Sequence, residues 1–285
     1  MNTTSNQPLK TLVLGSTGKT GSRVATRLIA LNWPVRLGSR NADIPFNWYD
    51  ETTWDAALHG MEAIYISFVP DLCVPGSVEK VGKLARKAVE KGIRKMVMLS
   101  GRGEPEALEC EQQVMHSGVA EWTIVRASWF CQNFSEGNFL DNILAGHLAL
   151  PAGDMAEPFV DADDIADVAV AAFTQQGHAG KVYEVTGLRA LTFQQAVDEI
   201  AKATGRSIRF ETISLDAYTD LLRSYQVPEE YVGLLRYLFG EVFDGRNAHP
   251  QDGVERALGR KPTDFSDYVQ KTVKSGAWNT ELASR

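Results

Sequence analysis

The chain of 285 residues has little positive charge, because 36 aspartates and glutamates outnumber 29 lysines and arginines. A net charge of −7 without any basic run argues against nucleic acid as a direct partner. No apolar run approaches the roughly 20 residues that a membrane-spanning helix needs. The polar segment 1–8 has no apolar core of a signal peptide, and we expect it to be a disordered N-terminus. The sequence therefore predicts a protein that is neither secreted nor embedded in a membrane.

Cysteine and histidine are also scarce. The three cysteines (Cys73, Cys110 and Cys131) form no CxxC pair and do not cluster with any of the five histidines. No HxxxH or HExxH pattern is present, and the acidic run at 161–164 has Ile165 where a calcium loop needs a third ligand. We therefore expect reduced thiols, a cytoplasmic location and no metal site.

Short apolar runs alternate with segments of helical periodicity in the first half of the chain. The runs that read as strands are 9–14, 34–38, 62–68, 93–99 and 121–126, with 45–50 as a weaker candidate. Segments 18–31 and 77–91 carry apolar residues at helical spacing, and the second stops at Gly92. Strands that alternate with helices indicate βαβ units and a parallel sheet.

This alternation ends after about Asn133. Segment 161–173 reads as a helix with acidic residues at its start, and 181–187 reads as a strand. Thr192 and Gln195 form a capping-box pattern ahead of a helix that closes at Gly205, and helices follow from 214 onward. We predict an α/β Rossmann-type fold, a doubly wound parallel sheet with a smaller, mainly helical C-terminal lobe. The expected core is 9–133, with 157–187 returning to the sheet, and the expected substrate lobe is 134–156 and 188–285.

The stretch TLVLGSTGKTGS (11–22) places glycines after the first strand, with a Gly-Lys-Thr triplet among them. A Walker A loop needs four residues between its two glycines, and counting back from Gly18 reaches Val13 inside the strand. The remaining pattern is Gly15-x-x-Gly18-x-x-Gly21, in which the glycines permit a tight turn, close approach to pyrophosphate and helix–strand packing. This turn predicts dinucleotide binding.

The end of the second strand indicates which dinucleotide is bound. NAD-binding proteins usually place an acid there for the ribose 2′-hydroxyl, but VRLGSRN (35–41) has none before Asp43. Arg40, with Ser39 beside it and Lys19 as a second cation, is suited to a 2′-phosphate. We therefore predict a preference for NADP(H) over NAD(H).

Several segments in order resemble the NmrA-like branch of atypical short-chain dehydrogenases/reductases, and within it the festuclavine dehydrogenase-type enzymes of ergot-alkaloid pathways. They include LVLGSTGKTGSRV, VMLSGRG, EQQVMHSGVAEWTIVRASWFCQNF and PFVDADDIADVAVAAF, and the similarity runs from about Leu9 to Val269. The resemblance implies that Arg40 holds the 2′-phosphate and that the glycine turn holds the pyrophosphate. The residues of that turn are Gly15, Ser16, Thr17, Gly18, Lys19, Thr20 and Gly21.

The resemblance also assigns roles beyond the turn. It implies that the loop of Phe68, Val69 and Pro70 runs alongside the adenosine and ribose of the coenzyme. It also implies that Ser100 faces the nicotinamide. Trp129, Phe130 and Asn133 line the nicotinamide and substrate pocket, although each aromatic is also compatible with an ordinary core position.

Ordinary short-chain dehydrogenases use a Tyr-x3-Lys pair as their acid, and the segment from Gly101 to Gly118 contains neither residue type. This disfavours carbonyl reduction, dehydration and epimerisation, and it leaves catalytic residues unassigned.

An iminium ion, a quinone or a dye accepts hydride without that acid. The sequence thus predicts an NADPH-dependent oxidoreductase acting on a small, flat molecule. The alternative is a non-catalytic NADP(H) sensor that regulates a partner protein. Substrate identity and oligomeric state, including a homodimer, stay open.

Overall fold

A computed structural model describes residues 7–279 of the chain. The expectation for 1–8 therefore falls largely on 1–6, outside the described residues. The chain forms two compact units, each described here by itself. The sheet unit comprises the described residues up to Ala127 together with Ala162–Val185 and Asp252–Arg260. The aromatic unit comprises Ser128–Asp161, Thr186–Gln251 and the described residues from Lys261 onward.

The sheet unit is built on one six-stranded sheet in which every neighbouring pair of strands is parallel. In spatial order its strands are β2 (Val35–Gly38), β1 (Thr11–Leu14), β3 (Ala63–Ile66), β4 (Lys95–Gly101), β5 (Glu121–Ala127) and β8 (Lys181–Val185). From β1 the chain first adds β2 on one side of the sheet and then crosses back to add β3 on the other side of β1. This reversal between β1 and β3 is a topological switch point, where open α/β sheets bind ligands outside the carboxyl ends of their strands.

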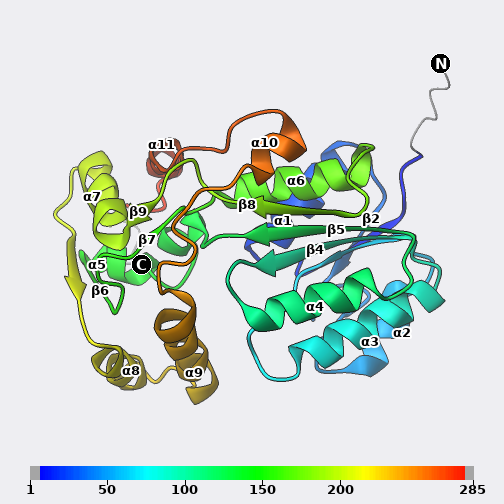
Figure 1. The fold of residues 1–285 in the computed structure, drawn as a ribbon, viewed down its shortest axis with the longest axis horizontal. Coiled ribbons are helices and arrows are strands. Elements are labelled where there is room, and N and C mark those ends of the chain that lie inside the picture. The colour runs from blue at the N-terminus through cyan, green and yellow to red at the C-terminus, as the bar shows by residue number, and fades with distance from the viewer. Residues whose placement is uncertain (1–6, 280–285) are drawn as a thin grey trace. The chain divides into compact units, whose positions relative to one another are not determined.

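Helices cover both faces of this sheet, as Figure 1 shows. Helices α1 (Lys19–Ala30) and α6 (Ala162–Thr174) pack together on one face. On the opposite face lie α3 (Ser77–Glu90) and α4 (Pro105–Met115). Because both faces are covered, β1 and β3 are buried along their whole length, and apart from Thr11 their residues are apolar without alternation.

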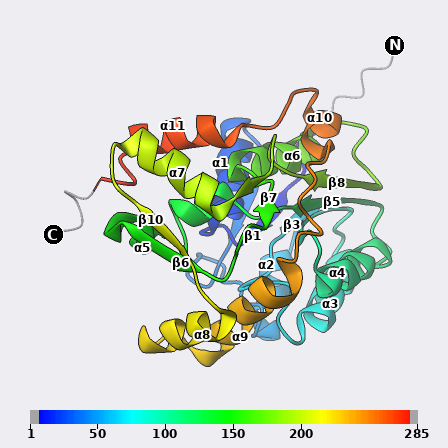
Figure 2. The ribbon, with the colours of Figure 1, turned by 60° about the vertical axis from the view of Figure 1, so that its left-hand side comes forward.

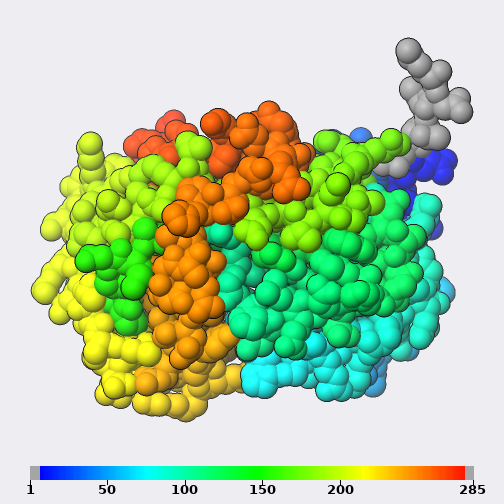
Figure 3. All heavy atoms as spheres, viewed as in Figure 1, coloured from blue at the N-terminus to red at the C-terminus, as the bar shows by residue number. Residues whose placement is uncertain are grey.

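A short late segment of the chain completes the sheet unit. Helix α10 (Gly253–Leu258) packs on α6 and β8, and Figure 3 shows it in orange over that part of the unit. Only glycine fits at Gly253, since a Cβ there would lie 2.1 Å from the carbonyl oxygen of Glu184. Arg260 then reaches Asp164 of α6 at 2.7 Å. No local pattern in the sequence predicts this return of the chain.

The aromatic unit contains a core of phenylalanine and other apolar side chains. Phe193 is fully buried and packs against rings that include Phe134, Phe159 and Phe243. Helices α7 (Phe193–Thr204) and α11 (Phe265–Ser275) pack together, as Figure 2 shows. The other elements of the unit are η2 (Cys131–Phe134), α5 (Leu140–Ala145), β6 (His147–Leu150), β7 (Ala156–Glu157), β9 (Leu191–Thr192), β10 (Arg209–Thr212), α8 (Leu215–Ser224), α9 (Glu229–Tyr237) and η3 (Leu238–Val242).

The predicted fold class is confirmed, as are the main strands and helices of the first half. The capping box of Thr192 and Gln195 is also present at the start of α7. The weak strand at 45–50 is wrong, because Asn47 and Asp50 form only an isolated bridge within a tight turn. Asp50 instead caps η1 (Glu51–Thr53), which leads into α2 (Trp54–Leu58). None of the helices between residues 7 and 279 combines the length and apolarity needed to cross a bilayer.

Candidate functional site

The glycine turn connects the end of β1 to the start of α1. Gly15 has a φ of +64°, a left-handed conformation that glycine adopts without strain. Its carbonyl oxygen accepts a hydrogen bond of 2.8 Å from the amide of Gly18. A Cβ at Gly21 would lie 2.2 Å from that same oxygen, so α1 approaches the turn closely only because Gly21 has no side chain. The turn thus has the tight bend predicted for Gly15 and the close helix packing predicted for Gly21.

The N-terminus of α1 carries no side-chain cap. Gly18 occupies the N-cap position, and the first turn of the helix contains no acidic residue. Thr17 and Gly18 are exposed, Ser16 and Lys19 are partly exposed, and Thr20 is buried. The uncapped N-terminus of a helix presents N–H groups and a partial positive charge that favour a phosphate. The turn can therefore hold an anion through its backbone.

Arg36 in β2 and Arg40 just after it have different surroundings in the structure. Arg36 is structural, since its Nη1 donates to the carbonyl oxygens of Ala56, Ala57 and His59. Arg40 is exposed, and no described residue makes a hydrogen bond or ion pair with its side chain. The amide of Ser16 donates to Gly38, which places the glycine turn beside the strand end that leads to Arg40. The free guanidinium and the uncapped helix therefore belong to one edge of the sheet.

The loop after β3 is held by two aromatic residues that sequence reasoning did not assign to the site. Trp48 donates from Nε1 to the carbonyl oxygen of Ser67, and its ring centroid lies 4.6 Å from that of Phe68. The hydroxyl of Tyr49 donates to the carbonyl oxygen of Val69 at 3.3 Å. Tyr49 and Val69 are both largely exposed, at 56% and 47%. In the sequence, both residues belong to the PFNWYD segment (45–50), whose pattern predicts only a weak strand.

Ser100, near the end of β4, is buried inside the sheet unit and hydrogen-bonded there. Its hydroxyl donates to the carboxylate of Glu111 at 2.6 Å, and only 3% of the residue is exposed. Arg126 binds the same carboxylate through Nε and Nη2, at 2.8 and 2.6 Å, and also reaches Glu184. A contact of Ser100 with nicotinamide therefore stays a prediction, and its hydroxyl has a structural partner.

We expect Glu111→Gln to destabilise the protein by about 3 kcal/mol, because it leaves the buried side of Arg126 without its carboxylate. Glu184 retains part of the pairing of Arg126, so the protein still folds. Denaturant unfolding measures the change. Glu109→Gln on the exposed side of α4 serves as the control and changes stability little. Equal stabilities of the two variants would contradict the structural role of this pair.

Trp129, Phe130 and Asn133 all lie in one short segment of the aromatic unit. The Trp129 ring packs on Phe239 and Phe243 with centroids 5.0 and 5.4 Å apart, so it is partly a core residue. Phe130 and Asn133 are partly exposed, and no described residue bonds to the side-chain amide of Asn133. The segment thus offers an aromatic surface and an available amide, and its contact with substrate remains a prediction.

The model of the NmrA-like family matches residues 9–272. The chain belongs to the NmrA-like family. This match confirms the resemblance found in the sequence and covers nearly the whole chain.

The chain is similar to an NAD(P)H azoreductase of Xenophilus azovorans. The two are 28% identical over 91% of this chain and 96% of that protein. It is also 26% identical to festuclavine synthase I of Penicillium roqueforti, over 91% of this chain and 96% of the relative. The ergot-alkaloid branch named from the sequence is thus among the relatives of this NmrA-like protein.

The fold of this NmrA-like protein also matches solved structures. An NADPH-dependent quinone oxidoreductase from Escherichia coli, crystallised with NADPH, superposes with a TM-score of 0.77 and 21% identity. The match covers 92% of this chain and 99% of that chain. At this identity the likeness shows a shared fold.

Proposed function

We propose that the protein is an NADPH-dependent reductase that transfers hydride to a small, flat acceptor such as an imine or iminium ion, a quinone or a dye. Such an acceptor needs no Tyr-Lys acid in the protein, because an imine reacts as its protonated iminium ion and a quinone or dye delocalises the incoming charge. The proposed setting is the cytoplasm, where NADPH and reduced thiols occur together.

The observation that supports this proposal most is the set of features gathered at the carboxyl edge of the sheet, at the switch point between β1 and β3. The glycine turn, the uncapped N-terminus of α1 and the loop of Phe68, Val69 and Pro70 follow the adjacent strands β1 and β3. The close approach that Gly21 allows fits a pyrophosphate, which the backbone amides of the turn would hold. When bound, the coenzyme supplies the hydride, and the protein contributes positioning.

Arg40 supports the preference for NADPH. Its guanidinium is exposed and has no partner among the described residues, so it is available to a 2′-phosphate. No carboxylate occupies the end of β2 before Asp43 to hold a ribose 2′-hydroxyl instead. The relatives are consistent with this choice, since one is named an NAD(P)H azoreductase and one fold match was crystallised with NADPH.

The nature of the acceptor follows from what the segment after β4 lacks. Residues 101–118 include neither tyrosine nor lysine, and Ala107 in α4 is fully buried. Acceptors that delocalise the incoming charge, or become neutral on reduction, need no proton in the same step. The relatives include proteins named NAD(P)H azoreductase and festuclavine synthase I, and these names support acceptors of this kind. We assign acceptor contact to Trp129, Phe130 and Asn133.

The test is NADPH oxidation by the purified full-length chain against a panel of quinones, cyclic imines and azo or cationic dyes. We expect turnover with at least one acceptor class and much slower turnover when NADH replaces NADPH. Tight binding of NADP(H) without turnover on the entire panel would overturn the catalytic proposal and favour the sensor alternative. Turnover at equal rates with both coenzymes would contradict the role of Arg40.

A further inference from the structure

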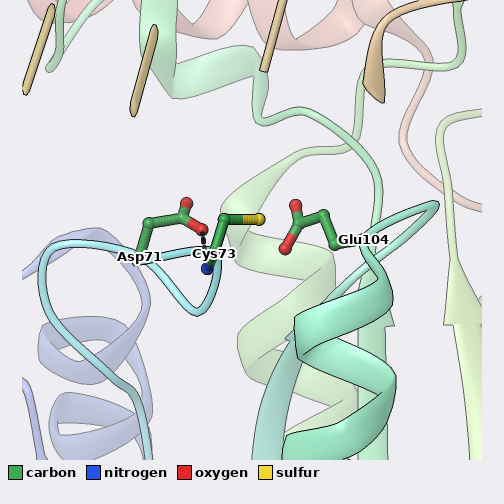
Figure 4. A group of neighbouring side chains, drawn as sticks. All are labelled: Asp71, Cys73 and Glu104. Atoms are coloured by element: carbon green, nitrogen blue, oxygen red, sulfur yellow. Dashed lines mark hydrogen bonds between the residues drawn. The ribbon is translucent and has the colours of Figure 1, made fainter. Parts of the chain in front are cut away.

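Two loops at the carboxyl edge of the sheet bring a thiol and two carboxylates together. Asp71 and Cys73 lie in the loop after β3, and Glu104 immediately precedes α4, after β4. Strands β3 and β4 are parallel neighbours, so their following loops meet at the same edge. Figure 4 shows the three side chains directed toward one another from these two loops.

The donor atoms of these residues are close enough to share one ion. One carboxylate oxygen from each acid and the Sγ of Cys73 all lie within 4.8 Å of one another. A tetrahedral zinc ion, with bonds of about 2.0 to 2.3 Å, holds its ligand atoms about 3.4 to 3.7 Å apart. Small side-chain rotations therefore suffice to bring the three atoms to bonding distance.

The cluster carries acidic groups without a matching cation. Among the described residues, no lysine, arginine or histidine forms an ion pair with Asp71 or Glu104. Burial, followed by the charge of Asp71, raises the pKa of Glu104 to about 8. Burial also raises the pKa of Asp71, and it raises the pKa of the Cys73 thiol with help from both carboxylates. Neither carboxylate is therefore paired with a positively charged side chain of the described residues.

The Glu104 side chain lies close to the backbone at the end of β4. A Cβ at Gly101 would lie 2.2 to 2.3 Å from the carboxylate atoms of Glu104. The carboxylate therefore lies close to the backbone of Gly101 at the end of β4. On the other loop, the amide of Cys73 donates to Asp71 Oδ1 at 2.9 Å and fixes that carboxylate beside the thiol.

We propose that Asp71, Cys73 and Glu104 form a binding site for one divalent metal ion of the zinc class. A thiolate with carboxylates suits zinc, and cobalt as its spectroscopic substitute, whereas magnesium and calcium prefer oxygen ligands alone. Three protein ligands leave a fourth tetrahedral position for water or another ligand. The sequence analysis predicts no metal site because it considers only histidine patterns, CxxC spacing and a calcium loop, whereas these three ligands come from two separate loops. This site stands independently of the proposed reductase activity.

The experiment titrates cobalt(II) into the full-length chain after reduction and removal of metals with a chelator. We expect one equivalent to bind, with an absorption band from thiolate-to-cobalt charge transfer that zinc(II) then abolishes by displacement. Cys73→Ser should remove the band. Asp71→Asn and Glu104→Gln should each weaken cobalt binding about tenfold or more. Replacing a residue that only orients a metal ligand already lowers metal affinity by about that factor.

Two control variants test whether the effect belongs to this cluster. Glu109→Gln removes an exposed carboxylate from the same helix, and Cys110→Ala removes the neighbouring buried thiol. Both should bind cobalt as the original chain does, with circular dichroism confirming that every variant is folded. The proposal is overturned if the original chain shows no thiolate band at millimolar cobalt. It is equally overturned if the band persists in folded Cys73→Ser, or if both carboxylate variants bind normally.

Discussion

Gly21→Ala is expected to abolish detectable NADPH binding and to destabilise the protein by about 3 kcal/mol. The new Cβ would lie 2.2 Å from the carbonyl oxygen of Gly15 and 2.8 Å from that of Leu14. Both contacts are with backbone, so α1 must move away from the turn for the methyl group to fit. That movement withdraws the N-terminus of α1 from the place where the pyrophosphate would be held. Calorimetric titration with NADPH and denaturant unfolding measure the two effects.

Two other glycines separate these effects. A Cβ at Gly18 meets only the Gly15 carbonyl oxygen, at 3.3 Å, so Gly18→Ala should fold nearly as well while obstructing the exposed turn. Gly233 in α9 has open space around it, and Gly233→Ala should bind NADPH normally and leave stability equal or higher. Normal NADPH affinity in folded Gly21→Ala or Gly18→Ala protein would show that the turn does not hold the coenzyme.

Arg40→Gln is expected to weaken NADPH binding about 10- to 100-fold, as the loss of charge-assisted hydrogen bonds to a phosphate predicts. NADH lacks the 2′-phosphate, so its affinity should be nearly unchanged. The variant should therefore lose most of its discrimination between the two coenzymes. Because Arg40 is exposed and has no partner in the described structure, its replacement should leave stability unaltered.

Arg94→Gln is the matched control for this substitution. Arg94 is also an exposed arginine, but it precedes β4 and so belongs to the opposite, amino edge of the sheet. Its replacement should change neither coenzyme affinity. A parallel loss of NADPH and NADH binding in Arg40→Gln would indicate a general electrostatic effect and contradict recognition of the 2′-phosphate.

The parts of the molecule that were predictable from sequence are those encoded by neighbouring residues. The spacing of Gly15, Gly18 and Gly21 reflects local backbone requirements, and the structure shows the tight turn at Gly15 and the close approach of α1 at Gly21. The apolar strands and the helical periodicities of the first half arise because helices cover both faces of one sheet. The capping box of Thr192 and Gln195 is likewise local, and it was found correctly.

Features that depend on distant residues could not be predicted in this way. The PFNWYD segment alternates like a strand, yet Trp48 and Tyr49 serve to hold the loop after β3. The return of α10 to the sheet depends on Gly253 meeting Glu184, which lies 69 positions earlier in the sequence. Similarly, Ser100 was interpreted without its partner Glu111, because only the fold shows which carboxylate its hydroxyl meets.

Calorimetric titration of the original chain with NADPH and, separately, with NADH tests the central claim most directly. The glycine turn and Arg40 predict binding of one NADPH per chain, with clearly weaker binding of NADH. Absence of binding by either coenzyme at millimolar concentration would contradict the account.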